Sequence, residues 1–103
     1  MIRKVVISKT AEKKLDELFS YLIEKWSVKV KNEFIEKLDA SIEIIKNKPE
    51  IFPESKKGKK LRKCVVTKHT TFYYRINLDR KEIEIITVFD TRQNPKKLEK
   101  DIK

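Results

Sequence analysis

The sequence contains one glycine, one cysteine and one histidine among 103 residues. A single glycine excludes the glycine-rich loops that hold phosphates in nucleotide-binding proteins. The lone cysteine, Cys64, cannot form an internal disulfide, which indicates a reducing compartment and predicts a cytoplasmic protein. We interpret Cys64 as a small buried hydrophobe rather than a nucleophile. One histidine and one cysteine make a poor ligand set, so we expect no metal ion and no other cofactor.

Long apolar stretches are also missing. No apolar run exceeds three residues, so the sequence predicts no membrane-spanning segment. The first residues lack the apolar core of a signal peptide. The apolar residues nevertheless recur at regular spacings, and the length predicts one folded domain over residues 1–103.

Positive charge is abundant, with 26 Lys and Arg against 16 Asp and Glu and a net charge of +10. A general lysine bias could explain the total, so the distribution is more informative. Between Ser55 and Leu78 the chain carries eight Lys or Arg and no acidic residue. This cluster favours an anionic partner: a nucleic acid, a ribonucleoprotein surface or an acidic protein segment.

The first half of the chain is predicted to form a strand and two helices. Ile2–Ile7 is short and rich in β-branched residues, as strands are. After Ser8, apolar residues recur every three or four positions, which predicts a helix. Ser27 interrupts this pattern and can cap a second helix, which Pro49 ends. The short connection predicts an antiparallel helical hairpin, and we interpret Trp26 beside it as a packing residue.

The second half is predicted to form three strands after a loop over residues 49–60. Leu61–Thr67 and Thr70–Ile76 should form a hairpin around a tight turn, and Glu82–Phe89 should be the last strand. Residues 96–103 form a short basic C-terminal tail. The predicted fold is α+β with the order β-α-α-β-β-β, a helical hairpin packed on a mostly antiparallel four-stranded sheet.

Alternation along the second hairpin strand predicts two different faces. One set is mostly apolar and should face the core: Thr70, Phe72, Tyr74 and Ile76. The other set offers a hydroxyl, a phenol and a cation, as a recognition surface does: Thr71, Tyr73 and Arg75.

The candidate chemical groups are cations and phenols, which can bind phosphates and stabilise a phosphorane-like transition state. The candidates for catalysis are Arg62 and Arg92, both at predicted strand ends where a long cation reaches solvent at little structural cost, together with His69 and Tyr73. A solvated side chain in the hairpin turn is the alternative for His69. The candidates for contact with a nucleic acid or another target are Lys57, Lys59, Lys60, Lys63 and Arg75.

The element order, the hairpin with Tyr74-Arg75-Ile76 and the segment Phe89–Pro95 (FDTRQNP) resemble the RelE/ParE superfamily of bacterial toxins over nearly the whole chain. The resemblance implies the toxin of a type II toxin–antitoxin pair. Some members cleave mRNA on the ribosome, and others inhibit DNA gyrase without chemistry of their own. It also implies a cognate acidic antitoxin, encoded nearby, that wraps the toxin in a hetero-oligomer.

The resemblance extends only partly to the residues of the ribonuclease members. Arg62 stands where they have a basic residue, and Arg92 matches the arginine after their last strand. Thr71 falls where several carry an arginine, and Leu98 falls near their C-terminal tyrosine. We therefore expect inhibition of translation, by ribosome binding or by ribosome-dependent mRNA cleavage. A gyrase inhibitor is the alternative, and a general RNA-binding module explains the charge but not the motif.

Overall fold

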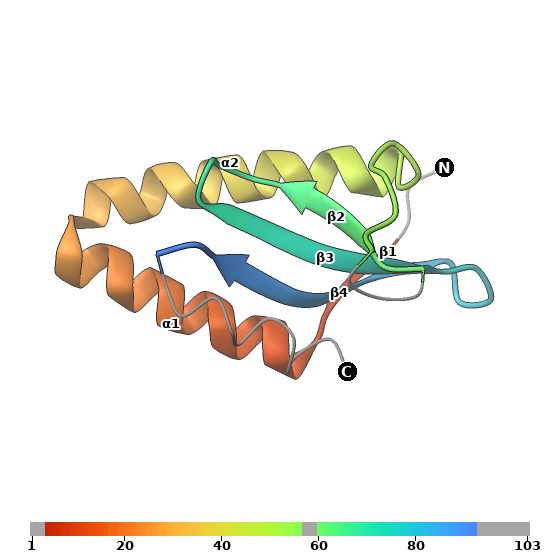
Figure 1. Ribbon diagram of the computed structural model, residues 1–103, viewed down its shortest axis with the longest axis horizontal. Helices are drawn as coiled ribbons and strands as arrows, with labels where there is room; N and C mark the ends of the chain where they lie inside the picture. Colours follow the sequence, from red (N-terminus) through yellow and green to blue (C-terminus); the bar gives the residue numbers. More distant parts are fainter. Residues whose placement is uncertain (1–3, 57–59, 93–103) are drawn as a thin grey trace.

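The computed structural model describes residues 4–56 and 60–92, and Figure 1 shows their arrangement. The elements are β1 (Lys4–Ile7), α1 (Lys9–Lys25), α2 (Val28–Asn47), β2 (Arg62–Val65), β3 (Thr70–Asn77) and β4 (Glu82–Asp90). This order confirms the predicted α+β fold. The predicted basic tail, the position of Leu98 and two candidate lysines, Lys57 and Lys59, lie outside the described residues.

The four strands form one sheet in the order β1-β4-β3-β2. β1 runs parallel to β4, and the other two pairs are antiparallel, so the sheet is mostly antiparallel, as predicted. In Figure 1 the two helices run in opposite directions and join at one end of the molecule. The main core lies between these helices and one face of the sheet, since its buried residues come from both helices and from β2, β3 and β4.

The predicted helix boundaries have clear local causes. The hydroxyl of Ser8 accepts a hydrogen bond from the Ala11 N–H at 3.0 Å, and that of Ser27 accepts one from the Val30 N–H at 3.1 Å. Both serines therefore cap helices, which satisfies N–H groups that have no partner inside the helix. The last residue of α2 is Asn47, two positions before Pro49.

The hairpin of β2 and β3 closes around a two-residue turn at Lys68 and His69. Thr67 and Thr70 exchange backbone hydrogen bonds across it, at 3.2 and 3.3 Å. The predicted tight turn is confirmed.

An irregularity in β4 determines which side chains lie beneath the helices. Along β3, Tyr74 is opposite Ile85 but Tyr73 is opposite Thr87, so Ile86 is an extra residue. A bulge of this kind shifts the alternation of side chains by one position. Ile85 belongs to the main core before the bulge, and Val88 belongs to it afterwards.

Two predictions about aromatic residues are wrong. Tyr73 was expected on an open recognition surface, but it is only 4% exposed and packs with Leu61, Ile86 and Phe89 in a second, smaller cluster. The extra residue in β4 and the segment before β2 supply these neighbours. Trp26 was expected to pack, but it is 63% exposed because it ends α1 at the tip of the hairpin.

Candidate functional site near the turn of the helical hairpin

The two candidate arginines lie beside different parts of β3, one near its middle and one near its first residue. Arg62 is opposite Tyr74, whereas Arg92 follows Asp90, which is opposite Thr70. Four residues of strand separate these positions, or roughly 13 Å at about 3.3 Å per residue. The arginines therefore contribute to different regions.

Arg62 holds the loop that follows α2. Its Nη1 donates to the carbonyl oxygen of Phe52 at 2.6 Å and to that of Glu50 at 3.4 Å. The neighbouring Tyr74 hydroxyl donates to the Pro49 carbonyl at 2.7 Å. The expectation that Arg62 reaches solvent at little structural cost is wrong, because the loop folds back onto Arg62 and accepts hydrogen bonds from its Nη1.

Burial raises the pKa of Tyr74 to about 12, against a lowering influence of the Arg62 charge and a further raising influence of Cys64. Burial also raises the pKa of Cys64 to about 11, partly offset by a hydrogen bond with Ser41. Neither group is poised to ionise near neutral pH. Cys64 is fully buried, in agreement with its interpretation as a core residue.

Arg92 forms a two-point ion pair with Asp90. Its Nε donates to Oδ1 at 2.8 Å and its Nη2 donates to Oδ2 at 2.6 Å. Oδ1 also accepts the backbone N–H of Arg92 at 2.9 Å, and Oδ2 accepts the hydroxyl of Thr70 at 2.6 Å. The guanidinium carbon lies 5.7 Å from the centre of the Tyr21 ring on α1, within range of a cation–π contact.

These contacts keep both partners charged. Burial by itself would raise the pKa of Asp90, but hydrogen bonds from Arg92 and Thr70 and the charge of Arg92 outweigh it and lower that pKa. The hydrogen bond to Asp90 raises the pKa of Arg92. The ion pair is therefore present across the neutral range.

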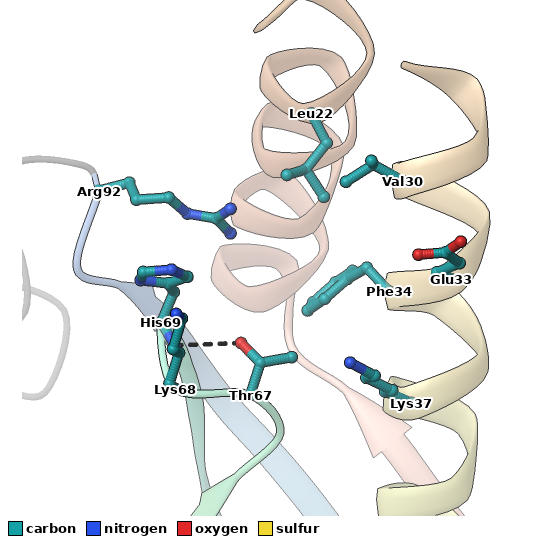
Figure 2. A pocket seen from close by; sticks show the side chains of 9 residues that line it. All are labelled: Leu22, Val30, Glu33, Phe34, Lys37, Thr67, Lys68, His69 and Arg92. Atoms are coloured by element: carbon teal, nitrogen blue, oxygen red, sulfur yellow. Dashed lines mark hydrogen bonds between the residues drawn. The ribbon is translucent and has the colours of Figure 1, made fainter. Parts of the chain in front are cut away.

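Arg92 lines a cavity of about 420 Å³ (Figure 2). The cavity lies between the two helices, near the turn that joins them, and the end of the sheet where β4 ends. The helices contribute apolar side chains and two charged ones: Leu22, Val30, Phe34, Glu33 and Lys37. The turn between β2 and β3 contributes Thr67, Lys68 and His69. Lys37, Lys68 and Arg92 outnumber Glu33 and the Asp90 carboxylate that is paired with Arg92, so the cavity suits an anionic group.

The cavity brings together two of the four catalytic candidates, Arg92 and His69. The His69 N–H donates to Thr67 Oγ1 at 3.1 Å, and its Nδ1 lies 3.5 Å from Thr91 Oγ1. Tyr73 packs in the second cluster, away from the main core, and Arg62 lies beside the middle of β3. The structure thus places Arg92 and His69 at one site, and the other two candidates, Arg62 and Tyr73, lie elsewhere.

The candidate binding residues that the structure describes are Lys60, Lys63 and Arg75. Lys63 is exposed, and Lys60 and Arg75 line a shallow hollow of about 380 Å³ near the turn between β3 and β4. Glu84 also lines this hollow and is opposite Arg75 in the sheet, so the hollow has mixed charge.

Sequence reasoning missed Asp90, Thr70 and Tyr21 as partners of Arg92. The spacing Asp-x-Arg directly after a strand was the available signal, because residues two apart on extended backbone lie on the same side. Lys37 had no local signal, since it is one of several lysines on the exposed side of α2.

Among residues 4–56 and 60–92, no three His, Cys, Asp or Glu side chains gather closely enough to hold a metal ion. No helix in these ranges is long and apolar enough to cross a membrane.

Comparison with known proteins identifies the family to which the chain belongs. The chain resembles the toxin fold in the chromosomal ParDE system of P. aeruginosa, with a TM-score of 0.72 and 10% identity over 86% of this chain and 96% of that one. It also resembles chains of the RelBE2 complex of Mycobacterium tuberculosis (TM-score 0.59, 13% identity, 87% and 99% covered). A third match is the E. coli RelBE complex (TM-score 0.54, 16% identity, 85% and 95% covered). A search of curated proteins gave no significant match.

These structures share the fold of RelE/ParE toxins. The sequence model of the ParE toxin of type II toxin–antitoxin systems matches residues 5–95. The chain therefore belongs to this family of toxins, and the resemblance seen in its sequence is confirmed.

Proposed function

We propose that this toxin inhibits growth by acting on translation, through ribosome binding or ribosome-dependent cleavage of mRNA. The observation that carries the proposal is the run of eight cations without an acid between Ser55 and Leu78, which suits a polyanionic target such as the ribosome. The cavity beside Arg92 supports it, because three cations from separate elements converge there. The proposed place of action is the cytoplasm.

We further propose an acidic antitoxin as the partner that holds the toxin inactive. The known structures of similar fold include toxin–antitoxin complexes. A net charge of +10 favours rapid association with an acidic chain. Co-purification of the toxin with the product of the adjacent reading frame tests this partner. Failure of that product to bind would count against it.

The target is tested by expressing the toxin without antitoxin and labelling new protein and new DNA with short pulses. The proposal requires that protein synthesis stops first, within minutes, while DNA synthesis continues. An early stop in DNA synthesis with continued translation would instead identify gyrase as the target. This test needs no inactive variant of the toxin, because its result is the order in which protein synthesis and DNA synthesis stop.

A further inference from the structure

Asp90 uses its whole capacity as a hydrogen-bond acceptor inside the protein. Its two oxygens accept four donors: the Arg92 N–H, Nε and Nη2 and the Thr70 hydroxyl. The residue is only 2% exposed. A carboxylate has about four acceptor positions, so none remains for a ligand. Asp90 therefore cannot contact a target directly.

The same bonds fix the orientation of Arg92. Two parallel hydrogen bonds to one carboxylate define the plane of the guanidinium, and the Tyr21 ring lies near its carbon atom. Among the interactions of the described residues, Nη1 is the one guanidinium nitrogen without a hydrogen-bond partner. In Figure 2 the guanidinium extends from the end of the sheet toward the cavity.

The ion pair also changes what Arg92 can contribute. Arg92 and Asp90 together carry no net charge, so long-range attraction of an anion to the cavity comes from Lys37 and Lys68 and is reduced by Glu33. Arg92 instead supplies a donor of fixed direction. A preorganised donor binds a group without first paying the entropy of ordering its own side chain.

We propose that Asp90 is a positioning residue that holds Arg92 with Nη1 available to the toxin's target in this cavity. This inference rests on the proposed function, since it concerns how the same site contacts its target. A purely structural role for the ion pair makes a different prediction. In that case growth inhibition follows the stability of each variant and does not depend on the direction of the Arg92 side chain.

Four variants separate these roles: Arg92→Lys, Asp90→Asn, the double variant and Arg80→Lys as a matched control in the distant turn between β3 and β4. Lysine at position 92 keeps the charge beside Asp90 and the fold, but it cannot make the planar two-point contact. Each chain is expressed without antitoxin, and survivors of induction are counted. Thermal unfolding of each chain and the NMR signal of the Arg92 Nε–H are measured in parallel.

We expect Arg92→Lys to remain folded and to increase survival on the order of 100-fold, the cost of a misplaced functional group. Asp90→Asn should broaden or remove the Arg92 Nε–H signal and increase survival similarly. The double variant should survive no better than Arg92→Lys alone, because Asp90 acts through Arg92. Arg80→Lys should inhibit growth as the wild type does.

Full growth inhibition by a folded Arg92→Lys chain would overturn the positioning role. So would additive effects of the two substitutions, or an Asp90→Asn chain that is folded, lacks the Nε–H signal and still inhibits growth. If Asp90→Asn does not fold, the growth inhibition by Arg92→Lys alone decides between the positioning role and the purely structural role. A wild-type chain that fails to inhibit growth would contradict the proposed function itself, which separates that failure from failure of this inference.

Discussion

Arg62 lies beside the middle of β3 and Arg92 lies near its first residue, and the protein uses the two arginines differently. Arg62 gives its Nη1 donors to backbone carbonyls of the loop after α2, which are neutral. Arg92 gives its donors to a buried carboxylate and faces a cavity with two lysines. Arg62 holds a loop in place, whereas Arg92 is itself held in place by Asp90.

This difference shows why a count of cations does not locate a functional site. Both arginines are half-buried cations next to strand ends. Their partners distinguish them, because a carbonyl tether leaves the positive charge in place while a carboxylate cancels it. The experiments below test that distinction, beginning with the largest expected effect.

Replacing Arg92 with alanine should cost about 3 kcal/mol of unfolding free energy, because the substitution leaves the buried Asp90 carboxylate without its charged partner. Chemical denaturation at pH 7 measures this loss. The exposed Arg80 is the control, and Arg80→Ala should change stability by less than about 0.5 kcal/mol. A loss at Arg92 no larger than that of the control would contradict the ion pair's importance.

The same substitution should alter the acid limb of the stability curve. The folded-state pKa of Asp90 lies below its ordinary value, so the pair stabilises the protein above pH 4. That contribution is lost as the pH falls further, through the folded pKa. The stability difference between wild type and Arg92→Ala should therefore shrink below about pH 4.

Replacing Arg62 with alanine should cost less, about 2 kcal/mol, because charged hydrogen bonds are lost but no buried charge is left behind. The carbonyls of Glu50 and Phe52 can then turn to water. Limited proteolysis should cut the loop between α2 and β2 faster in this variant, and urea denaturation gives the free energy. A larger loss for Arg62→Ala than for Arg92→Ala would reverse the comparison.

The sequence predicted the elements well because their signals are local. Serine caps, a helix-ending proline and alternating or helical spacing all act within a few residues. The locations of the side chains depended on structural features that the neighbouring sequence does not indicate. The extra residue at Ile86 shifted the alternation in β4, and the loop that folds back onto Arg62 joins positions ten or more residues apart.

Replacing Tyr74 with phenylalanine should cost about 1 kcal/mol, the typical value of one buried hydrogen bond, because the Pro49 carbonyl loses its donor. The difference should depend on pH in the alkaline range. The unfolded tyrosine ionises near pH 10, whereas its folded pKa is about 12, so wild-type stability falls as the pH rises above 10. Thermal unfolding between pH 7 and 11 should show the wild type losing its advantage, and a constant gap would contradict the assigned burial.

The smallest effect is expected for His69. Among residues 4–56 and 60–92, the polar contact of its ring is one at 3.5 Å to an exposed threonine, so His69→Ala should change stability by less than about 0.5 kcal/mol. RNA cleavage needs a group that removes the 2′-hydroxyl proton and one that protonates the leaving oxygen. The cavity offers one imidazole and an arginine that does not give up its proton. Its other charged side chains, Glu33, Lys37 and Lys68, are exposed and lack the burial that acid–base catalysts in active sites usually have. We therefore expect the purified toxin to leave free RNA intact and any cleavage to need translating ribosomes. Incubation of labelled RNA with toxin, with and without ribosomes, tests this, and rapid cleavage of free RNA that disappears in His69→Ala would show that the cavity is a complete nuclease site.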